Sequence, residues 1–151
     1  MGTYGNKAVW RWLALMLVVA APLCAAVRLP GIWQHHMVLQ RDQRLPVWGW
    51  AKPDEEITVQ FGGQIVMTVA DPTGCWRTTI GPFTANDEPW ELTVSGARTA
   101  LVLSNVVVGD VWLCSGQSNM EWPVRNARDS AAEMAAATNT LIRLATVKRV
   151  T

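Results

Sequence analysis

Apolar and polar residues alternate along residues 45–96. Five segments in this stretch, "LPVWGWA", "EEITVQF", "QIVMTVA", "CWRTTI" and "WELTVSG", show the pattern and are separated by Gly, Pro, Asn and Asp. Such alternation between turn residues predicts short antiparallel strands with one packed face and one solvated face. We expect neighbouring segments to pair as hairpins, including the first two segments, which flank Pro53-Asp54. Residues 27–108 are therefore predicted to form a β-sandwich domain.

The pattern changes further along the chain. "VWLC", residues 111–114, is a nearly continuous apolar run, which is typical of a strand covered on both faces. The Ala-rich residues 130–137 predict a helix, with Ser130 and Glu133 spaced as a capping box, and "LIRLATV" then returns to strand character. Strand, turn, helix and strand form the first βαβ unit of a parallel sheet. Residues 109–151 are therefore expected to begin an α/β domain that is truncated, since one such unit leaves sheet edges uncovered.

Residues 1–26 have the organisation of a leader. Lys7 and Arg11 lie before or at the start of an apolar run, and small residues follow it, which predicts a secretory signal peptide cleaved at the end of this segment. The run is shorter than the roughly 20 residues that span a bilayer, so we expect export without a permanent membrane span. A lipoprotein signal is disfavoured because Leu23, rather than a small residue, precedes Cys24.

Export affects the expected state of the two cysteines that remain, Cys75 and Cys114. An oxidising compartment permits a disulfide if the fold brings them together. Because they lie on different predicted strands, we expect two buried free thiols instead.

Composition argues against nucleic acid and metal chemistry. Charged residues make up 17% of the chain and the formal net charge is +1, so there is no basic footprint for nucleic acid, and a neutral or small polar ligand fits better. The only histidines, His35 and His36, have no Cys or carboxylate partners nearby in the sequence and make a poor zinc site, so no metal or cofactor is expected. We interpret them as strand-edge or loop residues, with a role as catalytic base as the minor alternative.

The segment "GDVWLCSGQSNMEWPV" places a small polar turn where an apolar run ends. Ligands of open parallel sheets bind beyond the carboxyl ends of the strands, which is where Ser118 is expected. Gly116 permits a sharp turn, and Ser118 can expose its hydroxyl while its own backbone N–H points at a developing oxyanion. The alternative is that Ser118 caps the following helix. A nucleophile elbow is disfavoured because Met120 replaces its last glycine, and Trp122-Pro123 favours a helix that begins only at Pro123.

This segment closely resembles the first conserved block of the sialate O-acetylesterase family, carbohydrate esterases of the SGNH hydrolase superfamily. "LPGIWQHHMVLQRDQRLPVWGWAKPDEEITVQF" and "WELTVSG" resemble the β-rich domain that precedes the block. The resemblance implies that Ser118 is the nucleophile toward an acetyl ester, that its N–H joins the oxyanion hole, and that the substrate is an acetylated carbohydrate, sialic acid or another sugar. In the family the other oxyanion donors and the Asp-x-x-His element lie further downstream, so the chain alone is expected to be nearly inactive.

Two further groups of residues are candidates for sugar contacts. Neighbours of the serine that could line a substrate pocket are Gln117, Asn119 and Trp122. Trp48 and Trp50 share one predicted strand face and could stack on a sugar, although large aromatics in a small β domain more often pack in a core or between domains. The alternative function is accordingly a non-catalytic carbohydrate-binding module with a vestigial esterase motif. The sequence carries no signal for an oligomeric state.

Overall fold

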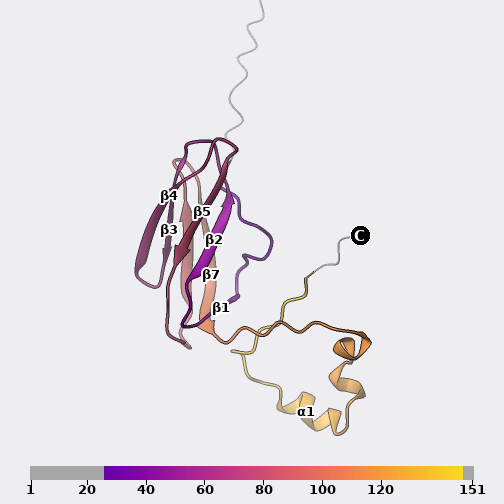
Figure 1. Ribbon diagram of the computed structural model, residues 1–151. Coiled ribbons are helices and arrows are strands. Elements are labelled where there is room, and N and C mark those ends of the chain that lie inside the picture. Colours follow the sequence, from indigo (N-terminus) through magenta and orange to yellow (C-terminus); the bar gives the residue numbers. More distant parts are fainter. Residues whose placement is uncertain (1–25, 148–151) are drawn as a thin grey trace, which may run out of the picture.

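The computed structural model describes residues 26–147, so the expected signal peptide lies outside the described residues apart from Ala26. Seven strands come first along this part of the chain: β1 (Val38–Gln40), β2 (Leu45–Trp50), β3 (Glu56–Phe61), β4 (Gln64–Val69), β5 (Cys75–Ile80), β6 (Trp90–Ser95) and β7 (Ala100–Gly109). Two 3₁₀ helices, η1 (Ser118–Glu121) and η2 (Val124–Asn126), and the helix α1 (Ser130–Ala136) follow them. Figure 1 shows the strands gathered in one body, with α1 on a loop below it. No helix within 26–147 has the length and apolar character needed to cross a bilayer.

The strands form two sheets. One has five strands in the order β1-β7-β6-β3-β4, and the other consists of β2 and β5. Pairing is antiparallel except between β1 and β7, which run parallel, so the larger sheet is mixed. All five strands expected from the alternation are present, and the hairpin between β3 and β4 is confirmed.

The hairpin expected between the first two segments is wrong. β2 pairs along its whole length with β5, and β3 pairs with β4 and β6 in the other sheet. Lys52 and Pro53 therefore lie on a connection between sheets rather than in a hairpin turn. Alternation shows which face of a strand is buried, but it does not choose the partner strand, which is set by packing between distant parts of the chain.

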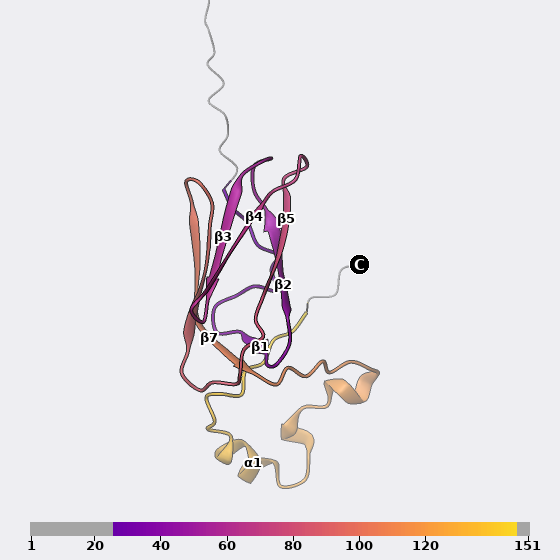
Figure 2. The same cartoon turned by 60° about the vertical axis from the view of Figure 1, so that its left-hand side comes forward.

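A single core lies between the two sheets. Figure 2 shows β2 and β5 on one side of the body and β7 on the other. Side chains from both sheets are fully buried in one cluster: Val47, Trp76 and Ile80 from the smaller sheet, and Ile57, Val59, Phe61, Leu92, Val94, Val106 and Val108 from the larger one. At one end of the core Phe61 packs edge-to-face against Phe83 and Trp90, at 5.1 and 5.4 Å between ring centroids. The predominantly β character expected of this part is thus confirmed.

Gly62 fixes the turn beside this aromatic cluster. Its φ is +54°, a conformation that L side chains rarely adopt, and a Cβ there would lie 2.6 Å from the Trp90 ring. The glycine therefore serves both the turn between β3 and β4 and the packing of the indole under it.

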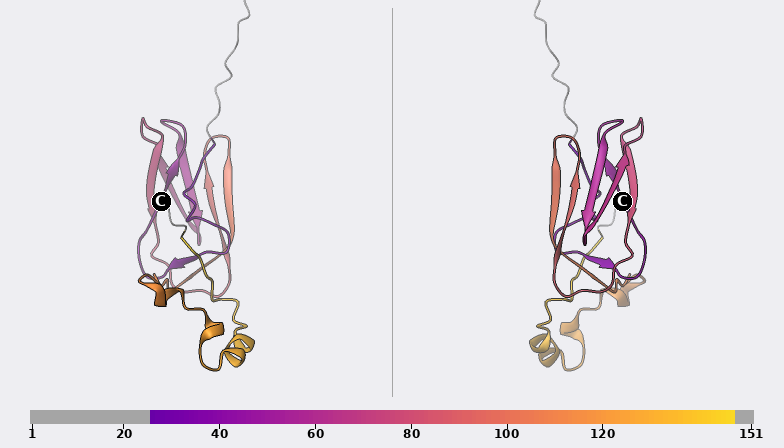
Figure 3. Two further views of the ribbon diagram at one scale, coloured as in Figure 1. Left: turned by 90° about the vertical axis from the view of Figure 1, so that its right-hand side faces the viewer. Right: turned by 90° about the vertical axis from the view of Figure 1, so that its left-hand side faces the viewer.

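Burial ends where β7 ends. No residue from 110 to 147 is buried, and Trp112 and Leu113 are 84% and 90% exposed. The strands expected at 111–114 and 141–147 are absent, because an apolar run becomes a strand only where another strand can take its backbone hydrogen bonds. Figure 3 shows the orange part of this region, with its helices, below the sheets in both views, while the yellow part rises again toward the strands.

Of the expected βαβ unit only the helix has formed, and its start differs from the expectation. α1 begins at Ser130, within the predicted range, but Asp129 occupies the N-cap position with a φ of 57° and makes no side-chain capping bond. The expected capping box between Ser130 and Glu133 is therefore wrong. A cap side chain must sit outside the helix with extended backbone to reach the free N–H groups, and Ser130 is already helical.

Candidate active site

Residues 109–124, which we call the motif segment, leave the sheet at the end of β7. Their direction is set by polar contacts with Gln40 and Arg41 at the end of β1. The Gln40 side-chain oxygen accepts the Val111 N–H at 2.8 Å, and the Arg41 Nε donates to Asp110 at 2.9 Å. The Arg41 N–H also donates to the Gly109 carbonyl at 2.9 Å, which closes the end of β7. The hydrogen bond to Asp110, followed by the charge of the same carboxylate, raises the pKa of the Arg41 guanidinium. These groups are exposed, so the contacts orient the chain more than they stabilise it.

A second attachment lies close to the far end of residues 110–147. The Arg143 guanidinium donates to the Asn105 side-chain oxygen at 2.8 Å, to the Met37 carbonyl at 3.2 Å and to the Asn105 carbonyl. Asn105 has a φ of 57° within β7, which turns its carbonyl and side chain toward the arginine. Because the Asn105 oxygen accepts from Arg143, its NH₂ group is the donor to the His36 Nδ1 at 2.7 Å. The segment from 110 to 147 is thus held at both ends against β1 and β7.

Ser118 lies on this segment as the first residue of η1 and is exposed. Gln117, not Ser118, occupies the N-cap position, and it makes no side-chain capping bond, so the alternative in which Ser118 caps a helix is not what the structure has. The backbone N–H groups of Ser118 and Asn119 have no acceptor within the described residues, as expected in the first turn of a helix. A hydroxyl and free amide donors are thus presented together.

Gly116 shapes the turn that precedes the serine. Its φ of +154° lies in the region that favours glycine, and a Cβ there would approach the Met120 Cγ to 2.9 Å. This backbone conformation is compatible with the role expected of Gly116. Helical structure begins at Ser118, before the expected start at Pro123, and Pro123 instead forms the N-cap of η2.

The candidate pocket residues are close in sequence but do not enclose a site. Gln117, Asn119 and Trp122 are all exposed, and the Trp122 N–H donates to the Asn119 carbonyl at 3.3 Å. Two shallow hollows lie on the β-rich region instead, one beside Trp48 and one beside Trp90. The assignment of the three residues to a substrate pocket stays a prediction.

The two histidines face β7. The His35 Nδ1 accepts the Ser104 N–H at 3.1 Å and lies 2.9 Å from its hydroxyl, while the His36 Nδ1 pairs with Asn105. Within the described residues the hydrogen bonds of both rings go to β7 and none goes to Ser118, so the role of either histidine as a base stays a prediction. Nor do three His, Cys, Asp or Glu side chains gather for a metal ion anywhere in the part of the chain that is described.

Both described cysteines are free, as expected, but neither is buried. Cys75 lies on the outer face of β5, and Cys114 lies in the exposed segment 111–114. The expectation of burial is wrong because Cys75 falls on the solvated face of its strand and no strand forms at 111–114.

The fold is similar to that of a solved enzyme. A solved carbohydrate acetylesterase from Xanthomonas citri matches with a TM-score of 0.72 and 42% identity, covering 76% of this chain and 26% of that one. No protein-family model matches the chain. Over the part covered, the fold is therefore similar to that of a carbohydrate acetylesterase.

The curated proteins that match the chain are sialate O-acetylesterases. The sialate O-acetylesterases of Mus musculus and Homo sapiens are 27% and 29% identical in alignments 135 residues long that cover 81% of this chain. These matches confirm the resemblance to the sialate O-acetylesterase family that the motif indicated. The chain spans about a quarter of the length of these relatives, 25% of the mouse protein and 26% of the human one.

Proposed function

We propose that this chain contributes the nucleophile segment of an exported carbohydrate O-acetylesterase that removes acetyl groups from sugars through a serine acyl-enzyme. The observation that carries the proposal is the exposed Ser118, with free amide donors beside it, on a segment that matches the family. Similarity to the sialate O-acetylesterases and to the Xanthomonas citri enzyme supports the acetyl ester as the bond cleaved. The composition of residues 1–26 supports export.

In the proposed reaction the Ser118 Oγ attacks the acetyl carbonyl and gives its proton to a base. The carbonyl oxygen becomes an oxyanion that accepts hydrogen bonds from the Ser118 N–H and further donors. The carbon–oxygen bond to the sugar breaks, the sugar hydroxyl takes the proton, and the acetyl group stays on Ser118. Water then releases acetate. Gln117, Asn119 and Trp122 would line the site for the sugar.

The base and the remaining oxyanion donors would come from polypeptide beyond the described residues. A serine without a base is a weak nucleophile, so the 151-residue chain alone is expected to be nearly inactive. The same polypeptide would complete an α/β domain over residues 109–147 and cover their exposed apolar side chains. Trp112, Leu113 and Leu144 are among the most exposed of these.

A chimera tests the proposal. Residues 26–147 would replace the matching segment of the Xanthomonas citri acetylesterase, and hydrolysis of an aryl acetate would be followed. Ser118→Ala should lower kcat by about 10⁴-fold or more, because the acyl-enzyme can no longer form.

Ser115→Ala is the matched control, three residues away in the same exposed segment, and should keep activity within a few-fold. A folded chimera that retains turnover with Ser118→Ala would reject the nucleophile assignment. A folded chimera that is inactive with Ser118 intact would instead favour a carbohydrate-binding module with a vestigial motif.

A further inference from the structure

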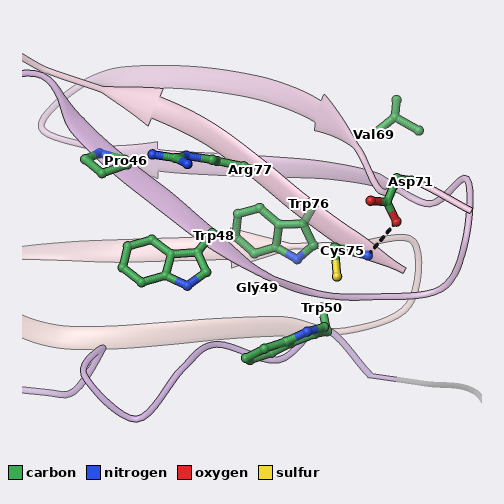
Figure 4. A pocket seen from close by; sticks show the side chains of 9 residues that line it. All are labelled: Pro46, Trp48, Gly49, Trp50, Val69, Asp71, Cys75, Trp76 and Arg77. Carbon is green, nitrogen blue, oxygen red and sulfur yellow. Dashed lines mark hydrogen bonds between the residues drawn. The ribbon is translucent and has the colours of Figure 1, made fainter. Parts of the chain in front are cut away.

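The outer face of the two-stranded sheet carries an aromatic surface remote in sequence from Ser118. The side chains of Pro46, Trp48 and Trp50 on β2, and of Cys75, Arg77 and Thr79 on β5, point away from the core, and we call this surface the indole face. Its tryptophans are 38% and 40% exposed, and together with neighbouring residues they line a shallow hollow of about 630 Å³ (Figure 4). None of these positions is used by the proposed esterase chemistry.

The indole rings of this face are held in place from outside the sheet. Trp33 packs edge-on against Trp48, with 5.9 Å between ring centroids and 79° between ring planes. The Arg28 guanidinium lies 5.8 Å from the centroid of the Trp50 ring. Such contacts restrict the side-chain rotamers before any ligand arrives, so binding would lose less conformational entropy.

The face also carries an exposed arginine. Arg77 lies across from Trp48 in the strand register, and its guanidinium has neither a hydrogen bond nor an ion pair within residues 26–147. Arg28 adds a second cation. Asp71 is the one carboxylate that lines the hollow, and a single one of its oxygens accepts three hydrogen bonds, from the Thr73 N–H, the Thr73 hydroxyl and the Cys75 N–H.

We infer that the indole face binds an acidic glycan, a sugar chain that carries carboxylate groups. The flat C–H face of a sugar ring would stack on Trp48 or Trp50, and a carboxylate would pair with Arg77 in a two-pronged hydrogen bond. A neutral sugar would use the rings but leave Arg77 without a partner. A purely apolar protein surface would bury that charge unpaired, which is costly. The chain as a whole is too weakly charged for nucleic acid.

This binding site goes beyond the proposed esterase. It is independent of the reaction at Ser118, because it lies on a different part of the fold. Its effect would be to hold an acidic polysaccharide on the protein whether or not that sugar is the one deacetylated.

The full 151-residue chain can be titrated by calorimetry and by tryptophan fluorescence. The probes are sialyllactose and trigalacturonate, each next to its own methyl ester, which keeps the sugar and removes the charge. The acids should bind at least tenfold more tightly than the esters, and the difference should shrink with added salt. Equal binding of acid and ester, or binding of neither acid, would overturn the inference.

Variants separate the two parts of the recognition. Trp48→Ala should weaken binding of both acids at least tenfold, and Arg77→Gln should weaken the acids while leaving any binding of the esters unchanged. Trp112→Ala, at an exposed tryptophan away from the sheets, is the control and should bind as the parent chain does. Melting curves check that each variant is folded. A folded Arg77→Gln variant with unchanged affinity for the acids would contradict the proposed pairing.

Discussion

Residues 27–109 and residues 110–147 contain similar apolar segments, yet only the first group buries them. "VWLC" is as apolar as the segments that became β3 and β6, but its tryptophan and leucine are exposed whereas Val59 and Leu92 are fully buried. The difference lies in the partners, because β3 and β6 pair with each other and face a second sheet, while 111–114 has neither neighbour. Hydrophobic sequence supplies the driving force for burial, but the fold requires a surface to bury it against.

The largest expected effect is on the stability of the β-rich region. Phe61→Ala should lower the free energy of unfolding by about 3–5 kcal/mol, because it removes a fully buried ring that packs against Phe83 and Trp90. Denaturant unfolding followed by tryptophan fluorescence measures this change. A loss below about 1 kcal/mol would mean that the aromatic end of the core is looser than its packing indicates.

The attachment at Arg143 sharpens the comparison, since a partly buried guanidinium there joins the exposed segment to the β-rich region. Arg143→Gln should lower the free energy of unfolding by about 1 kcal/mol, because charged hydrogen bonds to Asn105 and Met37 are lost from a partly buried position. Hydrogen exchange should also accelerate in the amides flanking Asn105. Arg98→Gln, at an exposed arginine in the β6–β7 loop, is the control. Equal effects of both variants on the free energy of unfolding would show that the hydrogen bonds of Arg143 do not attach the segment to the β-rich region.

Asp71 gives the β-rich region a predictable acid sensitivity. The hydrogen bond from the Thr73 hydroxyl, and then that from the Cys75 N–H, lower the pKa of the Asp71 carboxyl. Its stabilising contribution is therefore present above the unfolded-state pKa, about 3.9, and is lost as the pH falls through the lower folded-state value. Melting temperatures from pH 6 downward should show Asp71→Asn less stable than the parent at the upper end, with the gap closing in acid. A gap that widens in acid would reverse the assigned sign.

The smallest expected effect is at Trp112. In the 151-residue chain Trp112→Ala should change the free energy of unfolding by no more than about 0.5 kcal/mol, because the ring has no packing to lose. In the chimera with the Xanthomonas citri enzyme the same substitution should be clearly destabilising, if the added polypeptide covers the ring. A substantial loss in the isolated chain would show that the segment packs on the sheets after all.

The sequence was informative where the signal is local. Alternation located five strands, and an Ala-rich run located α1. It was uninformative where distant residues decide the outcome, as in the pairing of β2 with β5. β7, the longest strand, was not singled out because its apolar and polar residues alternate poorly. In the structure, Asn105 interrupts this strand with a left-handed backbone conformation.

The candidate site likewise has features with a local sequence signal and features that depend on distant residues. The position of Ser118 at an exposed turn followed from the motif, but the attachment of its segment through Arg143 had no sequence signal, since a single arginine near the end of a chain belongs to no pattern. The indole face was partly foreseeable, because Trp48 and Trp50 share strand parity. The contributions of Trp33 and Arg77 needed the register of β2 and β5.

The most direct measurement is labelling of the chimera with a fluorophosphonate, which forms a covalent adduct with activated serines, followed by peptide mapping. We expect one adduct, on the peptide that contains Ser118, and no comparable labelling of the 151-residue chain alone. An adduct on another serine of the grafted segment, or labelling that persists in Ser118→Ala, would contradict it.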